Sequence, residues 1–325
     1  MKENMKRIVL AGGSGFLGRA LAGYFQEKRW DVVILTRSPK AGADGIREIQ
    51  WDGVTGGPWE TELDGAMAVV NLTGRSVDCR YTPRNRKEIL DSRIHSTKII
   101  GAAIGRCPGP PSVWLNASTA TLYTHTFGEA WDENGRREAV AEAKDAFSVE
   151  VGMAWEQALD DAQVPRTRKV AMRMAMVLGH ARNSVFPVLR RLARLGLGGK
   201  MGNGRQYVSW MHIADYCSAV EWLINHEDMA GPVNLVAPHP LPNAEMMKIL
   251  RRICGVPFGL PAPEWMLEIG AFFLRTETEL IIKSRRVIPG RLLKSGFQFQ
   301  FPEIEEAFRN LMEQPEVKKQ AVSRG

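Results

Sequence analysis

Short runs of apolar residues alternate along the chain with longer segments in which apolar and polar residues are mixed. The first five runs are Ile8–Leu10, Asp31–Thr36, Ile46–Trp51, Ala66–Asn71 and Ser112–Ala117. Apolar runs of this length are typical of strands covered on both faces, and the segments between them are long enough to form crossover helices. The pattern therefore predicts a parallel sheet with helices on both faces and right-handed connections.

Two later runs, Arg168–Leu178 and Val233–Val236, bring the expected sheet to about seven strands. Between the strands, Pro83–Gly105 carries an imperfect apolar stripe, and Phe147–Ala162 repeats apolar residues at helical spacing. Both segments are predicted to be helices. From Asn183 onward the periodicity loosens, and proline-rich stretches frame the last helices.

This organisation predicts an α/β fold with a doubly wound Rossmann sheet and a small C-terminal substrate lobe. We assign residues 1–180 and 205–237 to the Rossmann domain and residues 181–204 and 238–314 to the lobe. The charged stretch at 315–325 is predicted to be a disordered or frayed tail.

Three glycines follow the first strand. Gly12, Gly15 and Gly18 are spaced G-x-x-G-x-x-G between that strand and a helix-like segment. In a dinucleotide-binding unit, the first permits a sharp turn, the second lets backbone N–H groups approach a pyrophosphate, and the third lets the helix lie close to the strand. The helix N-terminus adds unpaired donors and a partial positive charge. A glycine-rich turn without a ligand is the alternative reading of these three residues taken alone.

The end of the second strand indicates which dinucleotide is bound. Folds that prefer NAD place an acidic residue near this point for the ribose 2′-hydroxyl, whereas this chain has Thr36, Arg37 and Ser38. A guanidinium at Arg37 can pair with a 2′-phosphate in bidentate fashion, and Arg19 could add positive charge to the same site. The alternative is a solvated loop arginine. Together with the glycine turn, Arg37 favours NADP(H).

The fourth strand ends in the small residues Asn71-Leu72-Thr73-Gly74. At the carboxyl edge of a parallel sheet, such a segment is expected to pass under a bound cofactor. Arg93, in the following helix, either belongs to a solvated basic face or points back toward the cofactor phosphates.

Residues after the fifth strand suggest carbonyl or alcohol chemistry. Tyr123 would exchange a proton with the substrate while hydride passes to or from the nicotinamide, and Ser118 would hydrogen-bond the substrate oxygen. A tyrosine needs help to ionise at neutral pH, and the position four residues on, where such enzymes commonly have lysine, is Phe127. The alternative is that Tyr123 is an ordinary packed aromatic residue.

Polar and aromatic residues gather without clean periodicity between Arg205 and Asp215, as expected of a segment that faces substrate. We predict that Gln206, Trp210 and His212 line the substrate side. His212 could act as a base or ligand, or it could be structural and hold a loop through its ring nitrogens.

Composition narrows the classes of partner. The net charge of +7 and the isoelectric point near 9.3 favour anionic ligands, but the basic residues are scattered and no nucleic-acid partner is predicted. Four widely spaced cysteines without a C-x-x-C motif fit free thiols, and no metal site is predicted. No stretch approaches the ~20 apolar residues that span a bilayer, so we expect a cytoplasmic protein that does not associate with membranes.

Several of these segments occur together in one known group of proteins. They are GGSGFLG (Gly12–Gly18), NLTG (Asn71–Gly74), DSRIHST (Asp91–Thr97), the stretch Arg194–Asp215, VNLVAPHPLPN (Val233–Asn243) and RVIPGRLLKSGFQF (Arg286–Phe299). Together they resemble the atypical, extended-type short-chain dehydrogenase/reductases, which are often described as epimerase-family or nucleoside-diphosphate-sugar-epimerase-like proteins and sometimes as cell-division inhibitors. The resemblance covers nearly the whole chain.

The resemblance implies a Rossmann domain, a small C-terminal lobe and NADP(H) binding. By motif match it implies cofactor contacts from Gly12, Ser14, Gly15, Phe16, Leu17, Gly18, Thr36, Arg37, Leu72, Thr73, Arg93 and Val177. Tyr123 matches the second residue of the tyrosine pair that is usual after the fifth strand, where the first is here Leu122. The family has no well-established substrate.

Two hypotheses about function follow. The first is an NADP(H)-dependent oxidoreductase or epimerase that acts on a small polar or anionic molecule. The second is a catalytically impaired, NADPH-binding regulatory or scaffold protein, which the phenylalanine at position 127 motivates. An RNA-binding Rossmann protein would rest on the isoelectric point alone. The oligomeric state is open, and a homodimer is compatible with the sequence.

Overall fold

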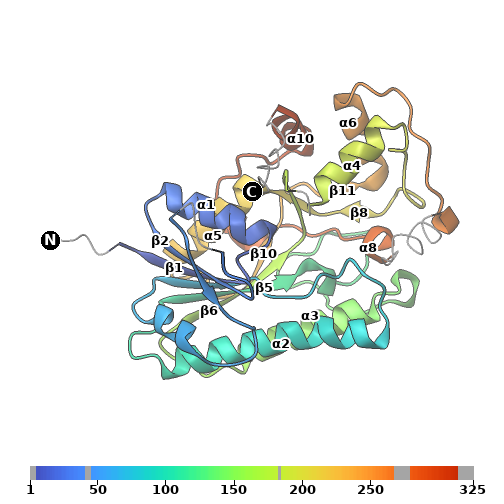
Figure 1. Ribbon diagram of the computed structural model, residues 1–325. Coiled ribbons are helices and arrows are strands. Elements are labelled where there is room, and N and C mark those ends of the chain that lie inside the picture. The colour runs from blue at the N-terminus through green and yellow to red at the C-terminus, as the bar shows by residue number, and fades with distance from the viewer. Residues whose placement is uncertain (1–4, 41–44, 182–183, 267–278, 314–325) are drawn as a thin grey trace, which may run out of the picture.

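Seven parallel strands form the central sheet (Figure 1), in the order β10-β6-β5-β4-β1-β2-β3. The computed structural model describes residues 5–40, 45–181, 184–266 and 279–313. The seven strands are β1 (Arg7–Ala11), β2 (Asp31–Thr36), β3 (Arg47–Gln50), β4 (Ala68–Asn71), β5 (Val113–Thr119), β6 (Arg168–Met174) and β10 (Gly231–Leu235). The strand order reverses between β1 and β4, where a doubly wound sheet opens a crevice for ligands. The predicted Rossmann sheet is confirmed.

Helices cover both faces of this sheet (Figure 1). On one face lie α1 (Phe16–Glu27) and α5 (Ile213–Asn225), and on the other lie α2 (Pro83–Arg106) and α3 (Ala146–Asp160). Successive strand residues point to opposite faces, so Ile8 packs beneath α1 while Val9 packs toward α2. Each strand is therefore apolar on both sides, which is why the strands form uninterrupted apolar runs in the sequence.

A second, smaller layer lies beyond the carboxyl ends of the strands. It contains α4 (Val185–Arg194), α6 (Asn243–Ile253) and α10 (Ile304–Glu313), with the short antiparallel pair β8 (Tyr207–Val208) and β11 (Leu241–Pro242). Its helices share a separate core that includes Phe186, Leu250 and Phe308. The layer takes α4, α6 and α10 from residues predicted for the lobe, and β8 from residues predicted for the Rossmann domain. The described residues also include three short 3-10 turns, η1 (Pro58–Leu63), η2 (Ala120–Leu122) and η3 (Ala141–Ala143).

The structure differs from the expected boundaries in two places. The predicted strand Arg168–Leu178 is divided into β6 and β7 (Met176–Leu178), and β7 leaves the main sheet to pair with β9 (Trp210–His212). After α8 (Glu279–Ile282), the chain returns to the sheet at α9 (Gly290–Lys294). Leu292 and Phe297 pack in the core on the α1 and α5 side, so residues 238–314 do not all belong to the lobe. The tail at 315–325 lies outside the described residues.

All four cysteines carry free thiols, as predicted. Within the described ranges, no helix is long and apolar enough to cross a membrane.

Candidate functional site

The turn between β1 and α1 requires two of its glycines for steric reasons. Gly12 has a φ of +72°, and a Cβ there would lie 2.9 Å from the Thr73 hydroxyl oxygen. A Cβ on Gly18 would lie 2.4 Å from the Cα of Gly13, which brings α1 directly against the turn. Neither position tolerates a side chain without movement of the backbone.

Gly15 differs from these two, because the space around it is open. It is the N-cap of α1 and offers no side-chain cap to the first N–H groups of the helix. The nearest atom to a Cβ at this position would be the Gly12 carbonyl oxygen, 3.8 Å away, and both Ser14 and Gly15 are exposed. Open space in front of uncapped N–H groups at a helix N-terminus fits a pyrophosphate.

The end of β2 leaves one arginine exposed. Thr36 is buried, whereas Arg37 and Ser38 are exposed just beyond the strand. Among the described residues, no carboxylate forms an ion pair with Arg37. Arg19 differs from the expectation, because its guanidinium forms an ion pair with Glu48 of β3. Its charge is therefore neutralised within the protein, and Arg37 is the better candidate for a 2′-phosphate.

The segment after β4 is held by Asn71, whose side chain is buried rather than directed at a ligand. Its amide donates to Asn116 Oδ1 at 2.8 Å, and its Oδ1 accepts the Thr73 N–H at 3.0 Å. Asn71 therefore shapes the turn on which Leu72 and Gly74 approach the cofactor position. Asn71 was expected among the cofactor contacts, and in the structure its side chain is bound to Asn116 and Thr73.

A cleft of about 490 Å³ opens at the carboxyl ends of β4 and β5. Among the residues expected to touch the cofactor, its lining includes Phe16, Leu17, Leu72, Gly74, Arg93 and Val177. These residues come from α1, the turn after β4, α2 and β7, so the cleft brings together segments far apart in the sequence. Ser118, at the end of β5, lines the same cleft.

One wall of the cleft is formed by α3, which was predicted from the sequence as a helix but not as part of the site. Phe147, Val151 and Trp155, four residues apart, all line the cleft, together with Ser148. None of these side chains exchanges a proton at neutral pH. Their i, i+4, i+8 spacing is the signal that could have found them, but it is also the spacing of a helix packed on a core.

Behind Ser118 lies a buried ion pair. The Ser118 hydroxyl donates to Glu156 Oε1 at 2.7 Å. Arg173 of β6 binds the same carboxylate in bidentate fashion, with Nε 2.8 Å from Oε1 and Nη2 2.7 Å from Oε2. Arg173 is 2 % exposed, so this pair is held almost entirely within the protein. Ser118 is therefore fixed in orientation from behind.

The structure contradicts the acid/base role predicted for Tyr123. Its side chain is 1 % exposed, and its hydroxyl donates to Asn234 Oδ1 and accepts from Arg173 Nη1, each at 2.8 Å. Burial raises the pKa of Tyr123 to about 12. The Tyr123 hydroxyl belongs to the hydrogen-bond network behind the cleft. Phe127 is exposed, packs against His125 and does not line the cleft. Tyr123 is a structural residue in this arrangement.

The predicted substrate wall is also corrected, because Gln206, Trp210 and His212 are all buried and none lines the cleft. Gln206 Nε2 donates to the Met201 carbonyl at 2.8 Å, and Trp210 lies in the core of the lobe. His212 is the N-cap of α5, where its Nδ1 accepts the Ala214 N–H at 3.1 Å. Their mixed polarity reflects local hydrogen bonding rather than exposure to substrate.

The buried His212 predicts a pH dependence of folding. Burial lowers its pKa from 6.5 to about 4. Because the unfolded chain then binds the proton more tightly, stability is lost as the pH falls from about 6.5 toward 4, by about 2 kcal/mol between pH 7 and pH 5. Urea unfolding at several pH values should show this loss. His212→Asn keeps a capping side chain and should flatten the profile; an unchanged profile would contradict the assignment.

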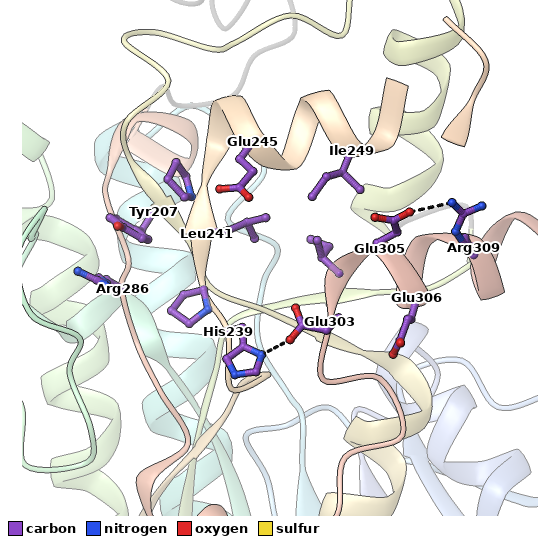
Figure 2. Close-up of a pocket in the computed structure, with 13 residues that line it drawn as sticks. Tyr207, His239, Leu241, Glu245, Ile249, Arg286, Glu303, Glu305, Glu306 and Arg309 are labelled. Carbon is purple, nitrogen blue, oxygen red and sulfur yellow. Dashed lines mark hydrogen bonds and ion pairs between the residues drawn. The ribbon is translucent and has the colours of Figure 1, made fainter. Parts of the chain in front are cut away.

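A separate hollow of about 690 Å³ lies in the lobe between α6 and α10 (Figure 2). His239 Nδ1 lies 2.6 Å from a carboxylate oxygen of Glu303, and both side chains are more than half exposed. The hollow shares no lining residue with the cleft. Within the part of the chain that the structure describes, no cluster of His, Cys, Asp or Glu could hold a metal ion.

A doubly wound parallel sheet, a sterically required glycine turn and a cleft at the switch point together form the architecture of a dinucleotide-binding Rossmann protein. The chain belongs to the NAD dependent epimerase/dehydratase family, whose model matches residues 8–236. Residues 262–311 match a Domain of unknown function (DUF1731). The resemblance recognised from the sequence motifs is confirmed.

Individual relatives match over nearly the full chain. The human epimerase family protein SDR39U1 is 30 % identical over 94 % of this chain and 99 % of its own length. Its crystal structure with NADPH matches with a TM-score of 0.83 and 28 % identity, covering 95 % of this chain and all of that one. Epimerase family protein YfhF of Bacillus subtilis is 28 % identical over 94 % of this chain and 97 % of its own.

A nucleoside-diphosphate sugar epimerase from Corynebacterium glutamicum matches with a TM-score of 0.74 and 26 % identity. The match covers 97 % of this chain and 60 % of that one.

Proposed function

We propose that this chain binds NADP(H) and acts as an oxidoreductase or epimerase on a small molecule held in the cleft. The observation that carries the proposal is the coincidence of an open, uncapped α1 N-terminus with an exposed Arg37 at the end of β2. The NADPH bound to human SDR39U1 supports the choice of cofactor. We further propose a cytoplasmic enzyme with no nucleic-acid or membrane partner.

Three parts of the chain would bind the cofactor. The N–H groups at the start of α1 would hold the pyrophosphate, and Arg37 would pair with the 2′-phosphate. Leu72, Gly74 and Val177, which all line the cleft, would support the nicotinamide end. The cofactor supplies hydride transfer, and Ser118 is one of the two polar residues of β5, with Thr119, that line the cleft and could face the reacting carbon.

The apolar α3 wall and the buried Tyr123 favour a second candidate, an NADPH-binding protein without turnover. The two candidates make different predictions about the cofactor. An oxidoreductase consumes NADPH in the presence of some carbonyl compound. A regulatory protein binds NADPH tightly but never oxidises it.

The experiment has two stages. The dissociation constant of NADPH is first measured by its fluorescence on binding. NADPH oxidation is then followed with panels of carbonyl compounds and, in the reverse direction, NADP+ reduction with alcohols and nucleotide sugars. Turnover with any compound supports the first candidate, tight binding without turnover supports the second, and absence of NADPH binding rejects both.

Arg37→Asp should weaken NADPH binding by at least about 100-fold while leaving NADH binding nearly unchanged, because NADH has no 2′-phosphate to repel. Titrations of both cofactors against wild type and variant measure the ratio. Arg29→Asp, in the turn after α1, is the matched control for added negative charge. Equal losses for NADPH and NADH would mean that Arg37 does not bind the 2′-phosphate.

A further inference from the structure

Arg93 has an unusual position for a cationic side chain. It projects from α2 into the cleft wall, where its guanidinium carbon lies 4.9 Å from the centre of the Trp155 ring. Its Nη1 donates to the carbonyl oxygens of Arg75 and Ile89, at 3.0 and 2.9 Å. A Cβ on Gly74 would lie 3.1 Å from the guanidinium carbon, so the absence of a side chain there permits the approach.

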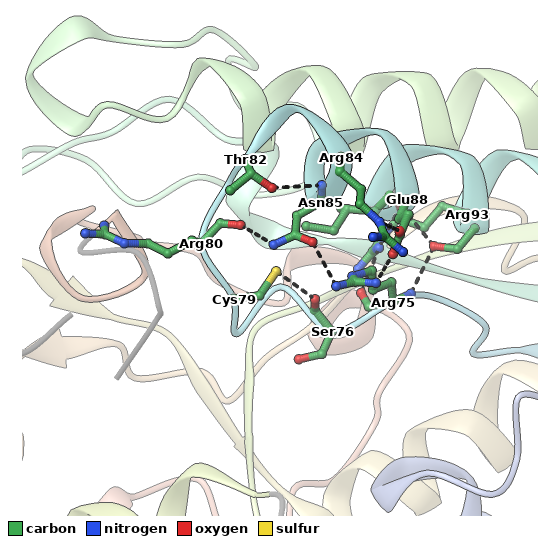
Figure 3. Close-up of polar contacts among 11 residues, drawn as sticks. Arg75, Ser76, Cys79, Arg80, Thr82, Arg84, Asn85, Glu88 and Arg93 are labelled. Carbon is green, nitrogen blue, oxygen red and sulfur yellow. Dashed lines mark hydrogen bonds and ion pairs between the residues drawn. The ribbon is translucent and has the colours of Figure 1, made fainter. Parts of the chain in front are cut away.

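The charge of Arg93 is not neutralised by the described residues. No carboxylate among them forms an ion pair with it, and its two hydrogen bonds are to neutral carbonyl groups. Arg75 offers a direct contrast in the same wall (Figure 3), since it pairs with Glu88 and donates to Asn85 Oδ1 at 2.9 Å. Burial lowers the pKa of Arg93 to about 10, so the group stays cationic at neutral pH in a poorly solvated position.

A desolvated, uncompensated cation in a ligand cleft is stabilised when an anion arrives. The cofactor phosphates already have their own partners in the proposed arrangement, at the start of α1 and at Arg37. Trp155 lies against Arg93, and the apolar side chains of Ile89 and Val151 line the same cleft. The subsite therefore combines one fixed cation with an apolar wall.

We propose that Arg93 binds the anionic group of the substrate, a carboxylate or a phosphate monoester, and that α3 holds an apolar body attached to it. The proposal rests on the proposed function, because it places this molecule beside the cofactor. Family resemblance implied that Arg93 contacts the cofactor, whereas this proposal assigns Arg93 to the substrate. A planar guanidinium anchored through Nη1 leaves Nε and Nη2 for bidentate pairing with two oxygens.

The test uses benzoate, phenyl phosphate and neutral benzamide as probes on protein saturated with NADP+. Calorimetry measures each affinity. Benzoate or phenyl phosphate should bind at least about 10-fold more tightly than benzamide. The ratio of the benzoate affinity to the phenyl phosphate affinity shows whether the site prefers a carboxylate or a phosphate. Arg93→Gln should abolish this preference while changing NADPH affinity less than about threefold.

Arg75→Gln is the matched control, because Arg75 lines the same cleft but is already paired, and it should keep the preference for anions. If Arg93→Gln fails to fold, Gly74→Ala tests whether the Arg93 guanidinium causes the preference for anions. The added Cβ would displace the guanidinium without removing its charge.

Two results would overturn the proposal. One is that Arg93→Gln weakens NADPH binding as strongly as Arg37→Asp does, which would mean that Arg93 binds the cofactor. The other is that the wild-type protein binds benzoate, phenyl phosphate and benzamide equally well, or that it binds none of them. Failure of wild type to bind NADPH would reject the proposed function instead, and the anion preference would then be measured on the cofactor-free protein.

Discussion

Gly18→Ala is expected to lower the free energy of unfolding by about 3 kcal/mol and to abolish measurable NADPH binding. The added Cβ would lie 2.4 Å from the Gly13 Cα and 2.5 Å from its carbonyl oxygen. Both are backbone atoms, so no side-chain rotation relieves the clash, and α1 must move away from β1. The N–H groups at the start of α1 would then lose their alignment. Urea unfolding and NADPH fluorescence measure the two effects.

The same helix contains a matched control. A Cβ on Gly23 would meet nothing within 4 Å, so Gly23→Ala should leave NADPH binding unchanged. It should also raise stability by up to about 1 kcal/mol, because alanine is the better helix former. If Gly18→Ala is as stable as Gly23→Ala, the close approach of α1 to the turn is not what fixes the site.

Glu156→Leu is expected to lower the free energy of unfolding by about 3–5 kcal/mol, because it leaves the Arg173 guanidinium buried without its carboxylate partner. The variant also removes the acceptor of the Ser118 hydroxyl, so we expect turnover to fall with any substrate found. Chemical denaturation measures stability, and NADPH titration checks that the cofactor site survives.

The double variant Glu156→Leu/Arg173→Met is the control for the charge itself. Replacing both partners with apolar residues should restore most of the lost stability, because no unpaired charge remains. Tyr123→Phe removes a hydroxyl bound to Arg173 but leaves the carboxylate, so it should cost much less. A double variant no more stable than Glu156→Leu would show that the ion pair is not the source of the loss.

The order of the sheet could be predicted because each strand carries its signal in its own residues. Apolar runs identified the strands, and the alternation with helices predicted that they run parallel. The division of Arg168–Leu178 was not predictable in this way, because Met176–Leu178 turns toward Trp210–His212, a partner more than thirty residues on. The return of Leu292 and Phe297 to the sheet likewise depends on distant packing.

The same contrast between local signals and distant contacts explains which site residues could be predicted from the sequence. The glycine turn is a local steric arrangement, so its spacing alone predicted it. Tyr123 was misassigned because its hydroxyl partners, Arg173 and Asn234, lie 50 and 111 residues further along the chain. The α3 wall was overlooked because Phe147, Val151 and Trp155 have the spacing of core residues, and only the folded chain shows what they face.

The single proton of the Ser118 hydroxyl determines the kind of group that it can meet. That proton is donated to the Glu156 carboxylate, which Arg173 also binds and whose oxygens act as acceptors. Toward the cleft, Ser118 therefore presents lone pairs and acts as an acceptor. A bare carbonyl oxygen finds no donor at Ser118, whereas a hydroxyl or amino group finds an acceptor. The cleft is thus matched to the alcohol form of a reacting molecule, and the search for substrates is best begun with NADP+ and alcohols.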